Sequence, residues 1–229
     1  MAGLFVTGTD TGVGKTRIAV ALMAALQGHG LRVAAMKPVS AGCERSAAGL
    51  RNDDALALQA QSSIALPYEL LNPYALEPPI APHIAAREAG VELQMDTLLE
   101  ACAQIESRAD YVVVEGAGGW LVPLDGQQTL ADLAAALAFP VVMVVGIRLG
   151  CINHALLTAQ AVRARGLKLA GWVANEITPS SPRADENVQS LGERLAAPLL
   201  GRVPFAPRAT VDETAACLHV APLLAAWRQ

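Results

Sequence analysis

The chain has 229 residues, 53% of them hydrophobic and 17% charged, and its formal net charge is −4. A globular protein of this length can bury a core of its own, and the mild negative balance excludes the basic surface that nucleic acid or an anionic membrane would require. Four cysteines without a CxxC pair favour reduced thiols in a cytoplasmic protein over a disulfide framework.

Short apolar runs alternate along the chain with segments rich in alanine and leucine. The runs are almost continuously apolar, which is typical of parallel strands covered on both faces. We therefore predict an α/β fold with a mostly parallel central sheet, flanked by helices on both faces, in a single domain over residues 1–229. The predicted strands are Leu4–Thr7, Val33–Val39, Tyr111–Glu115, Val141–Gly146, Leu169–Asn175 and Leu199–Val203. The predicted helices are Lys15–Gln27, Asp54–Gln61, Pro82–Ala89, Asp96–Arg108, Leu130–Ala138, Asn153–Arg165 and Asp185–Leu195.

Two proline-containing segments are predicted to be ordered loops. The first is Pro67–Pro82, which carries five prolines, and the second is Ile177–Arg183. The apolar stretch Leu130–Ile147 is interrupted by Asp132 and Pro140, so it predicts a helix followed by a strand and not a membrane span.

The segment Gly8–Thr16, Gly-Thr-Asp-Thr-Gly-Val-Gly-Lys-Thr, lies between the first predicted strand and the first predicted helix. Glycines in this position let backbone N–H groups converge on a phosphate in front of a helix N-terminus, which predicts binding of ATP with Mg²⁺. Lys15 would contact the β- and γ-phosphates, and the Thr16 hydroxyl would bind Mg²⁺. Five residues separate Gly8 from Gly14 where the usual pattern has four. The alternative is a glycine-rich strand–helix turn with a chance Gly-Lys-Thr.

Two acidic positions are candidates for the metal. Glu115 ends a buried strand and precedes glycines, which is typical of the carboxylate that binds Mg²⁺ directly or through water, although most such proteins have Asp there. Its alternative is a solvated acid at a strand end. Asn52-Asp53-Asp54 indicates a helix N-cap first, and Asp54 is assigned to the metal beside it.

Lys37 ends the second predicted strand, where a side chain projects into the crevice that binds ligands in such folds. It could hold a carboxylate or the transferring phosphoryl group, or it could be a surface lysine. Ser40 could reach the same crevice or form a turn before Gly42.

Three later segments are further candidates for binding. Gly150 and the N–H groups of residues 151–153 open a helix and could bind an anion, which we favour over a metal pair of Cys151 and His154. Asn175 and Pro204 follow strands, where they could read a purine or simply terminate the strand.

With these residues in place, the chain resembles the dethiobiotin synthetase family along nearly its whole length. The five-residue spacing in the loop and the Glu at position 115 both match that family. The motifs that carry the resemblance are Gly8–Thr16, Lys37-Pro-Val, Leu50-Arg-Asn-Asp-Asp-Ala-Leu, Asn72-Pro-Tyr, Pro82-His, Val114-Glu-Gly-Ala-Gly-Gly-Trp120, Leu149-Gly-Cys-Ile-Asn-His-Ala155 and Gly171-Trp-Val-Ala-Asn175.

The resemblance implies a homodimer with a P-loop NTPase fold related to nitrogenase iron protein and partition ATPases. Those relatives carry an extra lysine early in the loop, where this chain has Asp10. It also implies the reaction: 7,8-diaminononanoate takes up CO₂ as a carbamate, the carbamate oxygen attacks the γ-phosphate of ATP, and the second amine closes the ureido ring of dethiobiotin with release of phosphate.

The family pattern implies specific roles at matching positions. Lys15 and Lys37 would neutralise phosphoryl oxygens and carbamate, with Thr11 beside the diamine, and Thr16, Asp54 and Glu115 would hold Mg²⁺. The implied nucleotide-binding residues are Gly12, Val13, Gly14, Lys15, Thr16, Arg17, Asp54, Glu115, Gly116, Ala117, Gly118, Asn175, Glu176, Pro204, Phe205 and Ala206. The implied substrate-binding residues are Thr11, Lys37, Ser40, Gly118, Gly150, Cys151, Ile152 and Asn153, the last four facing the substrate carboxylate across the subunit interface.

The chain departs from the family at three positions: Gly12, where many members have Glu; Ala41, where some have a hydroxyl; and Asn187, where some have an aromatic residue. Two other functions share this loop type. An amidoligase of the cobyrinate-synthase type is expected to carry a glutamine-hydrolysing domain, which these 229 residues do not accommodate. A P-loop switch ATPase is expected to carry the extra lysine.

Overall fold

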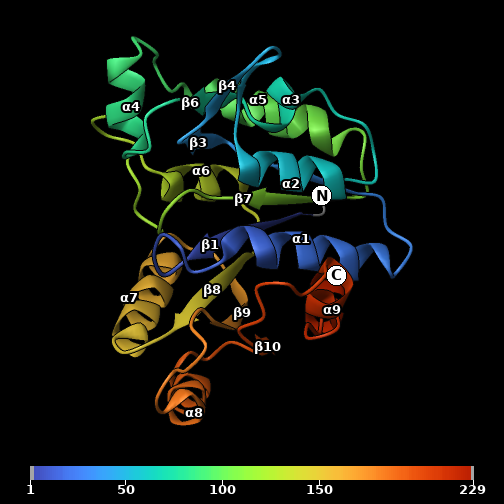
Figure 1. The fold of residues 1–229 in the computed structure, drawn as a ribbon, viewed down its shortest axis with the longest axis vertical. Helices are drawn as coiled ribbons and strands as arrows, with labels where there is room; N and C mark the ends of the chain where they lie inside the picture. The colour runs from blue at the N-terminus through green and yellow to red at the C-terminus, as the bar shows by residue number, and fades with distance from the viewer. Residues whose placement is uncertain (1–2, 228–229) are drawn as a thin grey trace.

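The computed structural model describes residues 3–227, so the ends of the predicted domain, residues 1–2 and 228–229, lie outside the described residues. Its centre is a sheet of six strands in the order β10-β9-β8-β1-β7-β2, and every neighbouring pair is parallel (Figure 1). The predicted α/β class with a parallel central sheet is confirmed. The strands are β1 (Gly3–Gly8), β2 (Val33–Met36), β7 (Tyr111–Glu115), β8 (Val141–Ile147), β9 (Leu169–Glu176) and β10 (Leu199–Val203).

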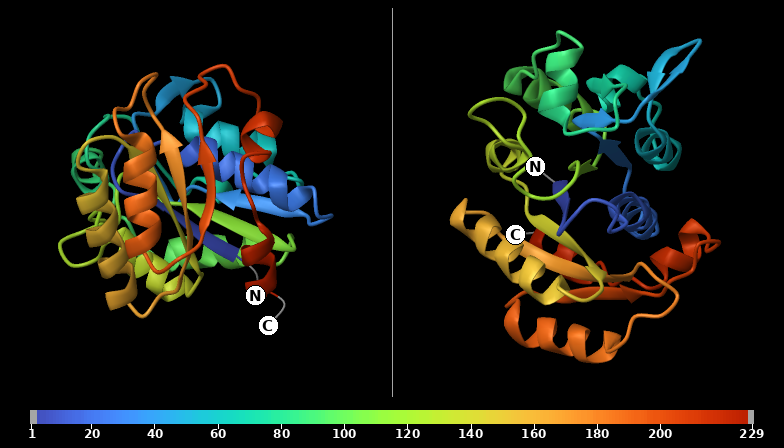
Figure 2. Two further views of the ribbon diagram at one scale, coloured as in Figure 1. Left: turned by 90° about the horizontal axis from the view of Figure 1, so that it is seen from below. Right: turned by 60° about the vertical axis from the view of Figure 1, so that its left-hand side comes forward.

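Apolar residues on both faces of each strand explain why the sheet is buried between two layers. In β1, Leu4 and Val6 pack into one core cluster, while Phe5 between them packs into the other. Successive side chains of a strand point to opposite faces, so a continuous apolar run feeds both cores. Figure 2 shows helices on either side of the strands.

The helices divide between the two faces. One core contains α1 (Lys15–Gln27) together with residues of α10 (Ala221–Trp227), and α9 (Val211–Ala215) packs beside α1 (Figure 1). The other core contains α4 (Pro82–Glu88), α5 (Met95–Glu106), α6 (Leu130–Leu137), α7 (Cys151–Ala164) and α8 (Ala184–Arg194). No helix within residues 3–227 is both long and apolar enough to cross a membrane.

The structure corrects the prediction around the second strand. The predicted strand Val33–Val39 is two strands: β2 ends at Met36, and β3 (Val39–Ala41) pairs in parallel with β6 (Tyr74–Leu76) in a separate two-stranded sheet. The break falls at Lys37-Pro38, where the Lys37 N–H donates to Leu71 O at 2.8 Å and proline has no N–H to continue the ladder.

The predicted loop Pro67–Pro82 is also corrected, because it contains α3 (Tyr68–Leu71) and β6. A hairpin of β4 (Glu44–Ser46) and β5 (Gly49–Arg51), and the helices α9 and α10, were not predicted. Helix α7 begins at Cys151, two residues before the predicted start, because Gly150 in a left-handed conformation (φ 90°) ends the preceding turn.

Candidate active site

The phosphate loop runs from the end of β1 at Gly8 to the start of α1 at Lys15. Gly14 has φ +88°, a left-handed conformation that favours glycine, and a Cβ there would lie 2.3 Å from Asn175 Nδ2. That amide nitrogen donates to Val13 O at 2.8 Å. The end of β9 therefore holds the loop directly, and residue 14 must lack a side chain.

Lys15 is buried at the start of α1, and its Nζ donates to the carbonyl of Asp10 at 3.1 Å, across the loop. Burial, and after it the nearby charge of Lys37, lowers the pKa of Lys15 to about 8. A phosphate group beside this ammonium would restore the charge that burial disfavours. Lys15 is thus placed where a bound anion would stabilise its ammonium form.

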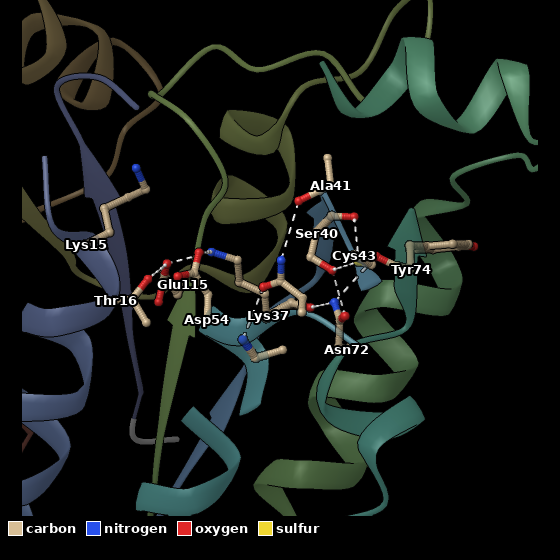
Figure 3. Close-up of polar contacts among 12 residues, drawn as sticks. Lys15, Thr16, Lys37, Ser40, Ala41, Cys43, Asp54, Asn72, Tyr74 and Glu115 are labelled. Atoms are coloured by element: carbon tan, nitrogen blue, oxygen red, sulfur yellow. Dashed lines mark hydrogen bonds and ion pairs between the residues drawn. The ribbon is translucent and has the colours of Figure 1, made fainter. Parts of the chain in front are cut away.

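Glu115 lies at the carboxyl end of β7 and is 0% exposed, which rules out the solvated strand-end acid. Its Oε1 accepts hydrogen bonds from Lys37 Nζ at 2.5 Å and Thr16 Oγ1 at 2.8 Å. Its Oε2 is buried without a hydrogen-bond partner among residues 3–227. Figure 3 shows Thr16 and Lys37 reaching Glu115 from different elements.

Lys37 follows β2 and is only 3% exposed, so it is not a surface lysine. Its Nζ also donates to Asp54 Oδ2 at 3.1 Å, which places one ammonium between two carboxylates. Burial alone would lower the pKa of Lys37, but Glu115 and then Asp54 outweigh it and raise the pKa above its ordinary value. Lys37 therefore remains an ammonium at neutral pH.

Asp54 lies in the first turn of α2 (Asp53–Gln61), and Asn52 is the N-cap, accepting from the Ala55 N–H at 3.3 Å. Burial would raise the pKa of Asp54, but Lys37, followed by a hydrogen bond from Thr16, lowers it overall. Asn52 thus caps the helix with its side chain, and the Asp54 carboxylate faces the cluster.

Within residues 3–227 no three His, Cys, Asp or Glu side chains gather in a metal-binding cluster. Thr16, Asp54 and Glu115 nevertheless form a set of one hydroxyl and two carboxylates, all oxygen donors. Mg²⁺ beside a nucleotide is usually bound by one or two carboxylates, water and phosphate oxygens. The unpartnered Glu115 Oε2 fits such an ion, because a buried carboxylate oxygen otherwise lacks compensation.

A cavity of about 810 Å³ opens over these residues. The predicted site residues that line it are Thr11, Gly12, Gly14, Lys15, Thr16, Lys37, Ser40, Asp54, Glu115, Ala117 and Gly118. Sequence reasoning did not assign a binding role to the rest of the lining, which comprises Ala41, Asn52, residues 79–82, Gly119 and residues 121–123. Of these, Asn52, Pro82 and Gly119 stand within motifs that carried the family resemblance, which was the available signal.

Other predicted residues lie outside this cavity. Buried Val13 and Gly116 support the loops, and the Asn175 Oδ1 is buried without a hydrogen-bond partner in the described part of the chain. Arg17 Nη1 donates to Pro204 O at 3.3 Å, and these residues with Ala206 line a second cavity of about 370 Å³. Phe205 is partly exposed beside it, while Glu176 pairs with Arg202 at 2.7 Å.

The predicted carboxylate-binding residues Gly150, Cys151, Ile152 and Asn153 do not line the large cavity. They form the start of α7, directly after Leu149, whose side chain is 100% exposed. In one chain these residues are therefore separate from Lys37 and Glu115.

The fold and the site permit a comparison with known proteins. A family model described as an AAA domain matches residues 2–212. The chain is 58% identical over 224 residues to the ATP-dependent dethiobiotin synthetase BioD of Pseudomonas aeruginosa (strain UCBPP-PA14), with 97% of this chain and 98% of the relative covered. The chain belongs to the dethiobiotin synthetase family. The family's BioD protein from Cellvibrio japonicus (strain Ueda107) is 53% identical over 220 residues, with 96% of each chain covered.

The family resemblance inferred from the motifs is thus confirmed. Among solved structures, this dethiobiotin synthetase fold is similar to that of the MinC:MinD cell division protein complex of Aquifex aeolicus, with a TM-score of 0.57 over 100% of this chain and 95% of that chain. At 17% identity, that likeness shows the P-loop fold alone and does not favour a switch ATPase.

Proposed function

We propose that the chain is an ATP-dependent cyclo-ligase that converts 7,8-diaminononanoate and CO₂ into dethiobiotin, with release of ADP and phosphate. The observation that carries the proposal is the meeting of Lys15, Thr16, Lys37, Asp54 and Glu115 in one cavity beside a phosphate loop. Membership of the dethiobiotin synthetase family favours this function over the amidoligase and the switch ATPase.

The nucleotide is proposed to be ATP, with its phosphates at Gly12–Thr16 and the N-terminus of α1. Lys15 supplies a positive charge there, and the backbone N–H groups of the loop supply directed donors. Thr16, Asp54 and Glu115 would hold Mg²⁺, which would neutralise negative charge on the phosphate oxygens. The nucleotide contacts of Arg17, Gly116, Ala117 and Gly118 belong to the same proposal.

The reaction needs positioning and charge stabilisation more than covalent help from the protein. One amine of the substrate and CO₂ form a carbamate, whose oxygen attacks the γ-phosphorus and releases ADP. The second amine then attacks the carbonyl carbon of the mixed anhydride, and phosphate leaves as the ring closes. Lys37, held as an ammonium, would stabilise the carbamate and the phosphoryl oxygens, and Thr11 in the cavity wall would contact the diamine.

The adenine is proposed to lie near Asn175–Glu176 and Pro204–Ala206. A buried amide oxygen without a partner at Asn175 fits an exocyclic amine, which is a donor. Its amide nitrogen already binds the phosphate loop, so one side chain would connect base and phosphate sites.

The substrate carboxylate is proposed to bind the start of α7, Gly150–Asn153, of a second subunit. The first N–H groups of a helix favour an anion, and the start of α7 does not line the large cavity of its own chain. A homodimer would then complete each site. The free thiols of all four cysteines are consistent with a cytoplasmic protein. Ser40 is a less direct substrate contact, since its hydroxyl donates to Asn72 Oδ1 at 2.7 Å.

The test is phosphate release from ATP with the purified protein, with diaminononanoate and bicarbonate omitted in turn. We expect release only when both are present, and release that ignores the diamine would refute the ligase function. Lys37→Gln removes the ammonium while keeping a polar side chain of similar length. We expect a loss of turnover at saturating substrate, and unchanged turnover would remove Lys37 from the reaction.

A further inference from the structure

Asn72 lies between α3 (Tyr68–Leu71) and β6, is 2% exposed, and does not line the large cavity. Both atoms of its side-chain amide nonetheless contact the segments that carry the site. Nδ2 donates to Lys37 O at 2.7 Å and to Tyr74 O at 3.4 Å. Oδ1 accepts from Ser40 Oγ at 2.7 Å and from Tyr68 Oη at 3.1 Å. Two donors and two acceptors thus meet this one amide, and Figure 3 shows Asn72 among Lys37, Ser40 and Tyr74.

These contacts fix the orientation of the amide. Rotating it by 180° would place Oδ1 against the carbonyl oxygens of Lys37 and Tyr74, which cannot donate. The two hydroxyls could adapt to either orientation, but the two carbonyls accept only an N–H donor. The Lys37 carbonyl therefore depends on Asn72 for this buried hydrogen bond.

The same amide connects to the helix that carries Asp54. Tyr68 Oη, which donates to Asn72, accepts from the backbone N–H of Asn52 at 2.8 Å. Asn52 is the N-cap of α2, so its position sets where the first turn, including Asp54, begins. The side-chain amide of Asn52 also donates to Ala41 O at 3.4 Å, so the same hydrogen-bond network includes β3.

The Tyr68 ring is held independently of its hydroxyl. The Arg51 guanidinium stacks over the ring at 4.0 Å from its centroid, and the ring packs with Ala55 and Leu71. Removing the hydroxyl alone would therefore leave the ring packed while breaking the path from Asn72 to Asn52.

We propose that Asn72 is a positioning residue that sets Lys37 relative to Asp54 through one buried amide. The inference rests on the proposed function, in which Lys37 acts on the reacting groups and Asp54 on the metal. Lys37 directly follows β2 and Asp54 lies on α2, and besides their own ion pair the two segments share this network. Loss of Asn72 would let both move, and a displacement of about 1 Å can cost about a hundredfold in rate.

The first experiment compares steady-state kinetics of the full-length chain with Asn72→Ala and Tyr68→Phe. We expect Asn72→Ala to lower kcat at least tenfold and to change KM for ATP by a smaller factor, because the side-chain hydrogen bonds of Asn72 go to Lys37, Ser40, Tyr68 and Tyr74. Tyr68→Phe should lower kcat by about threefold to tenfold. The matched control is Leu191→Ala, a truncation of a fully buried side chain on α8. It should lower the melting temperature at least as much as Asn72→Ala and keep kcat within twofold.

The second experiment repeats Asn72→Ala in the Lys37→Gln background, with labelled ATP and high enzyme concentration. Because Asn72 also positions Asp54, its loss should still lower the residual kcat there, but by a clearly smaller factor than in the parent, since residues acting as one unit are non-additive. An equal loss in both backgrounds overturns the inference. So does an Asn72→Ala kcat within twofold of the parent, or a Leu191→Ala kcat as low as that of Asn72→Ala. Full turnover by Lys37→Gln alone would instead refute the proposed role of Lys37.

Discussion

Gly14→Ala tests the geometry of the phosphate loop, and Gly12→Ala is its matched control. Both glycines have positive φ, +88° and +74°, so both substitutions carry a left-handed backbone cost of about 1–2 kcal/mol. A Cβ at position 12 meets nothing within 4 Å, whereas one at position 14 would lie 2.3 Å from Asn175 Nδ2. The two variants therefore share the backbone cost and differ in what the new methyl group contacts.

The extra cost at position 14 follows from the displaced amide. Asn175 must move and give up its 2.8 Å hydrogen bond to Val13 O. A buried hydrogen bond lost on one side costs about 1–3 kcal/mol. We expect Gly14→Ala to be about 2 kcal/mol less stable than Gly12→Ala, which for a chain of 229 residues corresponds to a melting temperature roughly 4–8 °C lower.

The assay is thermal unfolding by calorimetry without nucleotide, followed by titration with ATP and Mg²⁺. Asn175→Ala removes the clashing group, so in that background Gly14→Ala should fall to the cost of Gly12→Ala. Equal melting temperatures for Gly14→Ala and Gly12→Ala would refute the close approach of Asn175 to the loop. If Gly14→Ala still lowers stability more than Gly12→Ala in the Asn175→Ala background, the extra cost does not come from the Asn175 amide.

Three further outcomes are expected from the charges of the site. With its pKa lowered to about 8, Lys15 loses its charge in the free protein above that pH. If ATP binds only the charged form, the dissociation constant of ATP measured by calorimetry should rise about tenfold from pH 7 to pH 9. Lys15→Met has no charge to lose and should show no such rise, and a constant dissociation constant in the parent would contradict the assignment. The same shift implies that the free protein gains stability between pH 8 and 10.5, since there the unfolded chain binds the proton that the folded Lys15 has released. Glu115→Gln leaves Asp54 as the one carboxylate paired with the buried Lys37 ammonium. It should lower the free energy of unfolding by about 3 kcal/mol in urea titrations and weaken the dependence of turnover on Mg²⁺. A variant as stable as the parent would show that the buried pair contributes little to stability.

Much of the site could be predicted because the sheet is parallel. Glu115 is the last residue of β7 and Lys37 directly follows β2, and the carboxyl ends of neighbouring parallel strands meet at one edge. β2 and β7 are direct neighbours, so the two side chains come together although 78 residues separate them. The loop before α1 could be predicted for the same reason, since β1 lies next to β7.

The segments that carry and surround Asn72 were not predicted, because they are too short to show a periodic apolar pattern. β3 and β6 have three residues each and α3 has four, too short for an apolar pattern to indicate strand or helix. Prolines around them indicated a loop, yet α3 and β6 form through contacts with the Lys37 segment. The hydrogen bonds of Asn72 depend on that tertiary arrangement, so its type and position alone did not reveal them.

The departures from the family pattern lie at different places in the structure. Gly12 and Ala41 line the large cavity, so the side chains that other members carry there would project from its wall. Asn187 lies in the first turn of α8 and does not line that cavity. The first two departures therefore bear on the reaction site directly.

The most direct test of the proposed reaction follows the carbon that the enzyme adds. Purified protein is incubated with ATP, Mg²⁺, diaminononanoate and ¹³C-bicarbonate, and phosphate and the labelled product are measured together by colorimetry and mass spectrometry. The proposed mechanism predicts dethiobiotin with one ¹³C atom at the ureido carbon, and one phosphate released for each molecule formed. Phosphate released without labelled product would contradict it.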